Sequence, residues 1–380
     1  MTDRMNTLGL YLHIPFCRSK CLYCDFCSLP RPRAERVEAY VDALCRDLAG
    51  RAGDCRDYTV DTVYLGGGTP TLLSASQLER ILDTVARSYH LSPDSEITAE
   101  CNPSTVSRDT LLRMRQAGFN RLSMGLQSAH GEELKALGRL HSFADFCRTW
   151  EMARGAGFAN LSADVMSGIP GQTVESYLKT LERLCALEPE HISAYGLTVE
   201  EGTPFGNMGD RLILPDEEEA RQMYFEGCAY LESRGWKQYE ISNFAKTGYE
   251  SRHNLKYWNC TPYLGFGPAA YSDFGGARFG NSRDVDAYIR GEDITAEREI
   301  PTAEERVNEF VMLQMRLWQG INAEELRARF GVSLEDFFGE RARRFWDAGL
   351  LRRTEGGVAF SREGMYVSNL VLSEILSFAE

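Results

Sequence analysis

Short apolar, β-branched runs alternate with segments of helical spacing from the N-terminus of this 380-residue chain to about residue 234. The apolar runs end near Ile14, Leu65, Glu100, Leu126, Met166 and Leu197. After each run, apolar residues recur every three or four positions, which predicts a helix. The expected helices are Ala34–Leu48, Ser74–Ser88, Asp109–Gly118, Phe143–Gly157, Val174–Leu187 and Glu217–Arg234. Repeated strand–helix units of this length predict an α/β fold with parallel strands and right-handed crossovers.

Six strand–helix units favour an incomplete (β/α)6 barrel over an open, doubly wound sheet. In either architecture the ligand belongs at the carboxyl ends of the strands. Polar residues gather at those ends: the glycine-rich turn 66–70, Glu100, Gln127 and Asp164. One such residue is as readily structural as functional, but burying a series of unpaired groups would cost roughly 1–3 kcal/mol each. The series therefore predicts a ligand shell.

The last 80 residues depart from this alternation and predict a separate small domain. Helices are expected near Ala303–Leu317, Ala323–Arg329 and Leu334–Ala348, then a hairpin around Gly356 and Gly357, then a final helix from Arg362. This order resembles a winged helix. We therefore expect domains over 1–235, 236–300 and 301–380, with Gly275–Arg298 as a hinge-like linker.

Charge and cysteine usage limit the function classes. The chain has 55 acidic residues against 42 Lys and Arg, a net charge of −13 that disfavours nucleic acid as the main partner. The C-terminal domain itself carries ten arginines against thirteen acids, so a basic recognition face is not evident there. Eleven cysteines without a paired framework, and a polar start over Met1–Thr7, predict a reduced, cytoplasmic protein. No run reaches the roughly 20 apolar residues of a spanning helix; attachment to a membrane surface stays open.

Three cysteines lie close together just after the first apolar run: Cys17, Cys21 and Cys24. A [4Fe–4S] cluster normally takes four cysteines, so three leave one iron open to an external ligand. The amino and carboxylate groups of S-adenosylmethionine (SAM) suit that position, and an electron from the cluster can cleave the adjacent sulfonium bond. The alternative is a zinc site of four thiolates completed by Cys27. Structural zinc sites usually pair two hairpins across a longer gap, which favours the cluster, with Cys27 as a spare or supporting thiol.

The spacing CxxxCxxC resembles the signature of the radical SAM superfamily. Further runs resemble the family of coproporphyrinogen III dehydrogenases and HemW-type proteins: residues 10–17, 168–173, 192–197 and 239–244. The resemblance implies that Cys17, Cys21 and Cys24 hold the cluster. It also implies a set of SAM contacts: Tyr11, Tyr23, Gly67, Gly68, Thr69, Glu100, Gln127, Arg139 and Asp164. Among them, Arg139 suits the SAM carboxylate, and Glu100 or Asp164 suits a ribose hydroxyl or the ammonium group.

Two functions within that family are separated by three features. The oxidase usually has a further cysteine two residues after the third, where this chain has Phe26. It also has a long N-terminal extension, whereas this chain starts only ten residues before Tyr11. In contrast, residues 252–258 match the HNxxYW pattern associated with haem binding in HemW-type haem chaperones. The resemblance thus implies His253 as an axial ligand, with Tyr257 and Trp258 stacking on haem and Arg252 or Lys256 meeting its propionates.

The sequence therefore predicts a haem chaperone that carries a [4Fe–4S] cluster and SAM. Its expected partners are haem, acceptor haemoproteins and, if reductive chemistry occurs, an electron donor such as flavodoxin or ferredoxin. The alternative is an oxygen-independent coproporphyrinogen III oxidase. A radical SAM enzyme acting on tRNA is more distant, because the acidic charge opposes it.

Overall fold

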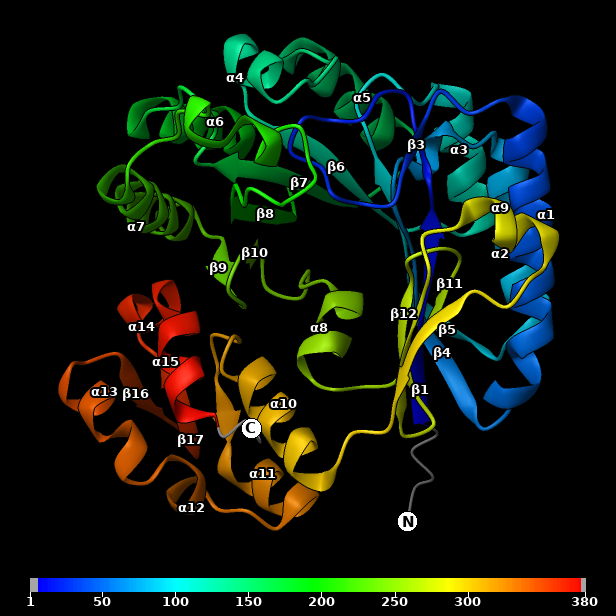
Figure 1. Cartoon of the computed structure of the whole chain (residues 1–380). Coiled ribbons are helices and arrows are strands. Elements are labelled where there is room, and N and C mark those ends of the chain that lie inside the picture. Colours follow the sequence, from blue (N-terminus) through cyan, green and yellow to red (C-terminus); the bar gives the residue numbers. More distant parts are fainter. Residues whose placement is uncertain (1–5, 377–380) are drawn as a thin grey trace.

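Six parallel strands form the centre of the computed structural model, which describes residues 6–376 (Figure 1). They are β1 Asn6–Ile14, β4 Tyr58–Gly67, β5 Leu91–Cys101, β6 Arg121–Gln127, β7 Asn160–Ser167 and β8 His191–Gly196. The strands follow one another across the sheet in chain order, and β8 does not pair back onto β1 within the described residues. The predicted incomplete (β/α)6 barrel is confirmed. Most of the polar N-terminal segment considered above lies outside the described residues.

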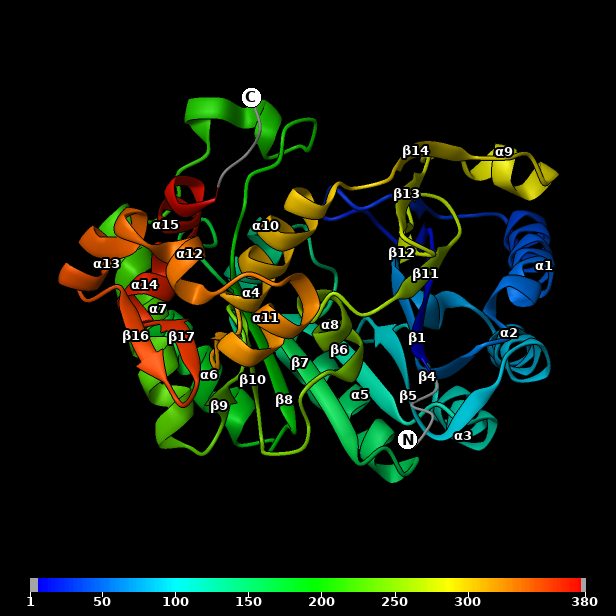
Figure 2. The ribbon, with the colours of Figure 1, turned by 90° about the horizontal axis from the view of Figure 1, so that it is seen from below.

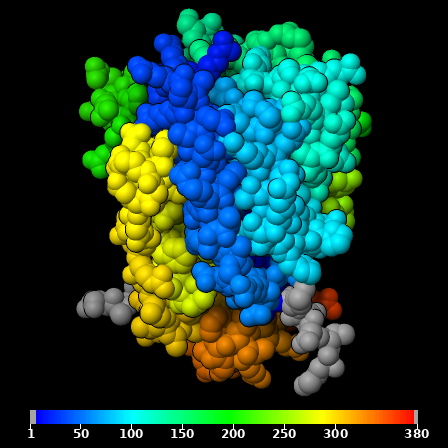
Figure 3. All heavy atoms as spheres, turned by 90° about the vertical axis from the view of Figure 1, so that its right-hand side faces the viewer, coloured from blue at the N-terminus to red at the C-terminus, as the bar shows by residue number. Residues whose placement is uncertain are grey.

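Helices cover the outer face of these strands, as the views of the ribbon and of the atoms show (Figures 1 and 3). They are α1 Ala34–Arg51, α2 Ala75–Ser88, α3 Arg108–Ala117, α5 Phe143–Gly155, α6 Val174–Cys185 and α7 Glu217–Ser233. Several begin where a short polar side chain caps the first turn, as Ser74, Ser142 and Asp216 do in reciprocal capping boxes. The six helices predicted from apolar spacing are confirmed to within a few residues.

The sheet continues beyond β1, through the segment expected to be a linker. Strand β11 Tyr263–Phe266 pairs parallel to β1, and β12 Tyr271–Phe274, β13 Ala277–Asn281 and β14 Thr295–Glu299 follow in antiparallel order. The prediction of a hinge over Gly275–Arg298 is wrong. Gly275 and Gly276 both have positive φ and make a two-residue turn between β12 and β13, which is the usual chemistry of a tight hairpin. Helix α9 Val285–Arg290 then packs against α1.

The other edge of the sheet ends in two short strands. Strand β10 Asn243–Ala245 pairs antiparallel with β8, and β9 Lys237–Gln238 pairs with β10. Helix α8 Arg252–Trp258 follows and lies across the opening of the barrel, next to α10 (Figures 1 and 2). The HNxxYW segment is therefore a helix on the inner side of the sheet, not a surface loop.

The C-terminal residues fold around a second hydrophobic core. Their elements are α10 Ala303–Gln314, β15 Ile321–Asn322, α11 Ala323–Phe330, α12 Leu334–Phe338, α13 Arg343–Asp347, β16 Leu351–Thr354, β17 Gly357–Phe360, α14 Arg362–Tyr366 and α15 Ser368–Ile375. Strands β15, β17 and β16 form a small sheet beside the helices, so the winged-helix-like domain is confirmed. The single helix expected over Leu334–Ala348 is interrupted at Gly339, where φ is 36° and ψ is −140°. None of the helices in residues 6–376 is both long enough and apolar enough to cross a membrane.

Candidate cluster and cofactor site

The cysteine loop leaves the sheet at the carboxyl end of β1, and three of its thiols line one cavity: Cys17, Cys21 and Cys24. The hydroxyl of Thr69 donates to Cys17 Sγ at 3.6 Å, and Arg139 Nη1 donates to Cys21 Sγ at 3.7 Å. Burial raises the pKa of Cys17, and it raises that of Cys24 to about 11. The thiols of Cys17 and Cys24 are therefore protonated near neutral pH, and cluster assembly must displace those protons.

The side chain of Cys27 does not line the cavity that the other three thiols share. Its side chain packs in the main hydrophobic core, and its Sγ donates to the carbonyl oxygen of Arg283 at 3.6 Å. Its own carbonyl accepts a 2.7 Å hydrogen bond from His13 Nε2. The structure thus does not supply the four-thiolate zinc site considered above.

An ion pair ties the cysteine loop to a segment more than 250 residues away. Arg283, in the turn between β13 and α9, contacts both carboxylate oxygens of Asp25 at 2.6 and 3.2 Å. The partnership lowers the pKa of Asp25, chiefly through the hydrogen bonds from Arg283. Both side chains are substantially exposed, so the pair contributes little stability alone; with the Cys27 contact it fixes the outer side of the loop. Sequence patterns give no signal for this contact.

The glycine-rich turn after β4 lies directly against this loop. A Cβ on Gly68 would lie 2.6 Å from the carbonyl oxygens of both Ile14 and Phe16, so only glycine fits. Gly67 has a φ of 100°, and its amide donates to Glu100 Oε2 at 3.1 Å. The turn therefore brings backbone to the cluster loop and fixes the carboxylate at the end of β5.

Two carboxylates share the inner wall of the cavity. Tyr64 donates to Glu100 Oε1 at 3.0 Å, and Ser123 donates to Asp164 Oδ1 at 3.1 Å. Burial raises the pKa of Glu100 to about 7, and the neighbouring Asp164 adds to the shift. Burial also raises the pKa of Asp164. Because burial disfavours the charged forms of both carboxylates, they are suited to bind a ligand that carries positive charge.

The opposite wall presents a cation. Arg139 Nη2 donates to Asn102 Oδ1 at 2.8 Å and to the Gly125 carbonyl at 2.6 Å. Its Nε is buried and has no hydrogen-bond partner among the described residues. Gln127 lies nearby with a φ of 66°, unusual for a residue with a side chain, and accepts a 3.0 Å bond from Tyr195. The guanidinium is thus placed to meet an anionic group.

These contacts bring together most of the predicted site. The cavity is lined by ten of the expected residues: Cys17, Cys21, Cys24, Tyr23, Gly67, Gly68, Glu100, Gln127, Arg139 and Asp164. Thr69 lies behind it as the hydrogen-bond donor to Cys17. Sequence reasoning missed several other lining residues, among them Asn102, Ser123 and Tyr195. Asn102 directly follows β5 and Tyr195 is the penultimate residue of β8, so their place at a strand end was the available signal; Ser123 lies inside β6 and gave none. Three thiols beside paired carboxylates and an incompletely bonded arginine fit a cluster and a zwitterionic amino-acid group.

Tyr11 and His253 are not part of this wall. Tyr11 lies deeper in the barrel, where its hydroxyl bonds to His13 Nδ1 at 3.1 Å and its ring stacks on Tyr64 and His253 at centroid distances of 6.2 and 6.5 Å. Tyr11 does not line the cavity that the three thiols share, and its contact with SAM stays a prediction.

His253 is buried, and both of its ring nitrogens are engaged. Nδ1 bonds to Thr62 Oγ1 and Nε2 bonds to Tyr257 Oη, each at 2.8 Å. Burial lowers the pKa of His253 to about 3, so the ring is neutral. A neutral imidazole with both nitrogens bonded has no free lone pair for iron. Axial ligation by His253 stays a prediction, and it would require one of these two hydrogen bonds to open.

The basic side chains of helix α8 are also engaged in ion pairs. Lys256 Nζ lies 2.6 Å from Asp61 Oδ1, and Arg252 lies 3.8 Å from the other oxygen of that carboxylate. The backbone amides of Arg252 and His253 both donate to Glu96 at 3.2 Å. Helix α8 is therefore anchored to β4 and β5, and its basic side chains serve that anchoring.

Comparison with known proteins identifies the family of the chain. The model of the radical SAM superfamily matches residues 11–184, and that of the HemN C-terminal domain matches residues 302–367. The chain is 36% identical to the heme chaperone HemW of Bacillus subtilis, over 96% of this chain and 98% of that protein. The chain belongs to the HemW family. Its HemW relative in Escherichia coli is 35% identical over 87% of this chain and 88% of that protein.

The fold of this HemW family member is shared with a solved enzyme structure. The coproporphyrinogen III oxidase HemN of Escherichia coli superposes with a TM-score of 0.85, over 98% of this chain and 91% of that one. Sequence identity is 23%, so this likeness concerns the fold.

The thiol geometry predicts which cysteines carry iron. Anaerobically reconstituted protein should hold about four irons and four acid-labile sulfides per chain, and Cys17→Ala, Cys21→Ala or Cys24→Ala should abolish both. Cys27→Ala is the matched control and should retain the cluster, because its thiol lies in the core. Stoichiometric zinc without sulfide, or equal cluster loss in the Cys27 variant, would contradict the three-ligand site.

The strand-end residues should bind SAM without holding iron. We expect Gln127→Ala and Asp164→Asn to weaken SAM binding about tenfold or more, since the first removes a polar group from the cavity wall and the second removes a negative charge. Iron and sulfide contents should match the parent. Isothermal titration of reconstituted protein measures the affinity, with the exposed Asp83→Asn on α2 as control. Unchanged SAM affinity in both cavity variants would assign the strand ends another role.

Glu100 should give the cofactor-free protein a distinctive pH dependence. Its folded-state pKa of about 7 lies above its ordinary 4.5, so its stabilising contribution is complete below pH 4.5 and is lost as pH rises through about 7. Glu100→Gln should reduce that loss by about 3 kcal/mol between these pH values. Denaturant unfolding across this range measures the difference, with the exposed Glu355→Gln as control. Parallel profiles for the parent and Glu100→Gln would show that this carboxyl does not titrate as described.

Proposed function

We propose that this protein binds haem and passes it to acceptor haemoproteins, with a [4Fe–4S] cluster and SAM in the cavity at the carboxyl ends of the strands. The observation that carries the proposal is the near-full-length similarity to bacterial proteins named as heme chaperones, at 31–36% identity. These similarities extend over both the barrel and the C-terminal domain.

The cavity supports the cofactor part of the proposal. Cys17, Cys21 and Cys24 would hold the cluster, which when bound supplies an electron to SAM. Arg139 would bind the SAM carboxylate, and Glu100 with Asp164 would face its cationic groups. The residues orient the ligand and exclude water from it; flavodoxin or ferredoxin is a partner only if that electron is used.

The alternative is oxidative decarboxylation of coproporphyrinogen III, favoured by the shared fold with the HemN oxidase. Phe26 argues against it: it occupies the position of the oxidase's additional cysteine and is 66% exposed on the cluster loop. A cysteine there would add a thiol beside the cluster, and phenylalanine cannot replace that chemistry.

One experiment separates the two functions. Anaerobically reconstituted protein is titrated with haem, followed by the Soret absorbance, and is then incubated with SAM, a reductant and coproporphyrinogen III. We expect saturable haem binding and no protoporphyrinogen, because the chain is proposed to carry the finished macrocycle. The matched positive control is a coproporphyrinogen III oxidase in the same assay. Robust turnover without haem binding would reject the chaperone proposal and support the oxidase.

A further inference from the structure

Arg121, the first residue of β6, is a buried arginine whose side chain has no hydrogen-bond or ion-pair partner within residues 6–376. Only 2% of the residue is exposed. Its neighbours in the sheet supply no partner either, because Thr98 Oγ1 and Asn160 Oδ1 are themselves buried without hydrogen bonds. A buried charge without compensation is costly, so arginines in protein interiors are normally paired. The position of Arg121 therefore calls for negative charge nearby.

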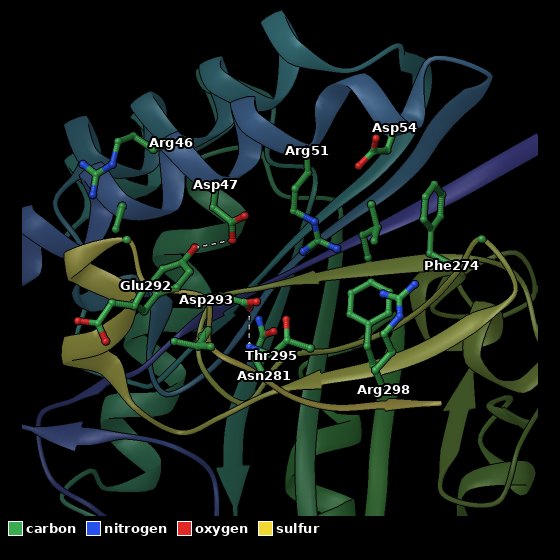
Figure 4. A pocket seen from close by; sticks show the side chains of 17 residues that line it. Arg46, Asp47, Arg51, Asp54, Phe274, Asn281, Glu292, Asp293, Thr295 and Arg298 are labelled. Atoms are coloured by element: carbon green, nitrogen blue, oxygen red, sulfur yellow. Dashed lines mark hydrogen bonds between the residues drawn. The ribbon is translucent and has the colours of Figure 1, made fainter. Parts of the chain in front are cut away.

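Other arginines without an ion pair have a different environment. Figure 4 shows Arg46, Arg51 and Arg298 in a cavity between α1 and the extension of the sheet, together with Asp47, Asp54, Glu292 and Asp293. Arg46 and Arg298 are exposed, and Arg51 is half-buried and donates to the carbonyl oxygen of Gly265 at 2.9 Å. Water and nearby carboxylates compensate these charges, whereas neither surrounds Arg121.

The register of the sheet places Arg121 one layer below the cofactor cavity. Side chains alternate along a strand, so Arg121 and Ser123 of β6 share a face, and Ser123 lines the cavity. Arg121 pairs with Thr98 of β5, and Glu100 lies two residues further along β5 on the same face. The rise along a strand and the spacing between strands put the Cα atoms of Arg121 and Glu100 about 8 Å apart. Two long side chains can bring their charges together over that distance.

The charge of Arg121 acts on both carboxylates of the inner wall. Burial raises the pKa of Glu100 to about 7, and Arg121 opposes that rise. Burial also raises the pKa of Asp164, and there again the charge of Arg121 acts in the opposite direction. A nearby cation favours the ionised form of a carboxyl group. Arg121 therefore offsets part of the cost of holding two neighbouring carboxylates in the interior.

The other groups that face Arg121 or the two carboxylates do not titrate near neutral pH. Burial raises the pKa of each tyrosine among them and lowers that of each histidine, so all are neutral. They are Tyr11, Tyr23, Tyr64, His191, Tyr195, Tyr239, His253 and Tyr257. Glu96 of β5 accepts from two backbone amides of α8, and Arg139 faces Asp164 from the opposite wall. The charge of the inner wall thus depends on Arg121, Glu100 and Asp164.

We infer that Arg121 is a positioning residue for SAM, whose fixed charge keeps Glu100 and Asp164 ionised for the cationic groups of that ligand. The inference rests on the proposed function and deepens it, since it explains how two buried neighbouring carboxylates can both carry charge. Arg121 does not line the cavity, so it acts through the carboxylates. Because it forms no direct bond to either of them, it leaves their oxygens available to the ligand.

The test is SAM titration of the full-length, cluster-loaded protein and its Arg121 variants across pH. At about pH 6.5, Arg121→Met should bind SAM about tenfold more weakly than the parent, because loss of the cation raises the pKa of the carboxyl groups by about one unit. At about pH 9 both carboxyl groups ionise without help, so the difference should disappear. Arg121→Gln should behave like Arg121→Met. Arg121→Lys keeps the charge and should bind SAM within about twofold of the parent at both pH values.

The controls separate this electrostatic role from a structural one. Iron and sulfide contents should equal those of the parent in every variant, and Met leaves no unpaired polar group in the barrel if Gln does not fold. Arg87→Gln changes an exposed arginine on α2 and should bind SAM as the parent does. Equal losses at both pH values, or a loss in Arg121→Lys as large as in Arg121→Met, would overturn the positioning role. A parent protein that binds no SAM at either pH would instead reject the cofactor part of the proposed function, so the two failures are distinguishable.

Discussion

The parallel arrangement of six strands is the constraint on which the rest of the structure depends. Because all six run the same way, their carboxyl ends meet at one edge, and residues in or just after the last turns of each strand face a common cavity. Cys17 arrives there from β1, Gly67 from β4, Glu100 from β5, Gln127 from β6 and Asp164 from β7. No single loop of the chain supplies that set; the parallel order of the strands assembles it.

Because the barrel is incomplete, polar side chains on the inner face of its strands need hydrogen-bond partners from another part of the chain. An incomplete barrel leaves polar strand residues such as Thr62 and Glu96 facing its interior, where unpaired burial would be costly. Helix α8 meets that need: His253 bonds to Thr62, and the first amides of the helix bond to Glu96. The same helix holds the C-terminal domain, because Gln314 of α10 donates to the carbonyl of Trp258 at 2.9 Å. The segment that fills the barrel is thus also the one that joins it to the C-terminal domain.

The barrel and its site were predictable because both depend on local patterns. Apolar runs end at the polar residue of each strand, and capping residues such as Ser142 mark where helices begin, so strand ends and site residues were found together. The extension of the sheet was not found, although the Gly275 and Gly276 pair is a hairpin signal; the charged, short strands around it lack apolar alternation. Long-range contacts such as Asp25 with Arg283 leave no trace in either segment.

His253 shows the limit of reading a motif from residue types. A histidine beside aromatic and basic residues has the chemistry of a haem site, but its role depends on which way the helix faces, which only tertiary packing decides. The central claim is that the parallel strand ends assemble one site for a cluster and SAM. Electron paramagnetic resonance of the reduced, reconstituted protein with and without SAM tests it most directly, because a ligand on the open iron changes the signal of the cluster. We predict a changed spectrum when SAM is added to the parent protein; identical spectra with and without SAM would contradict the account.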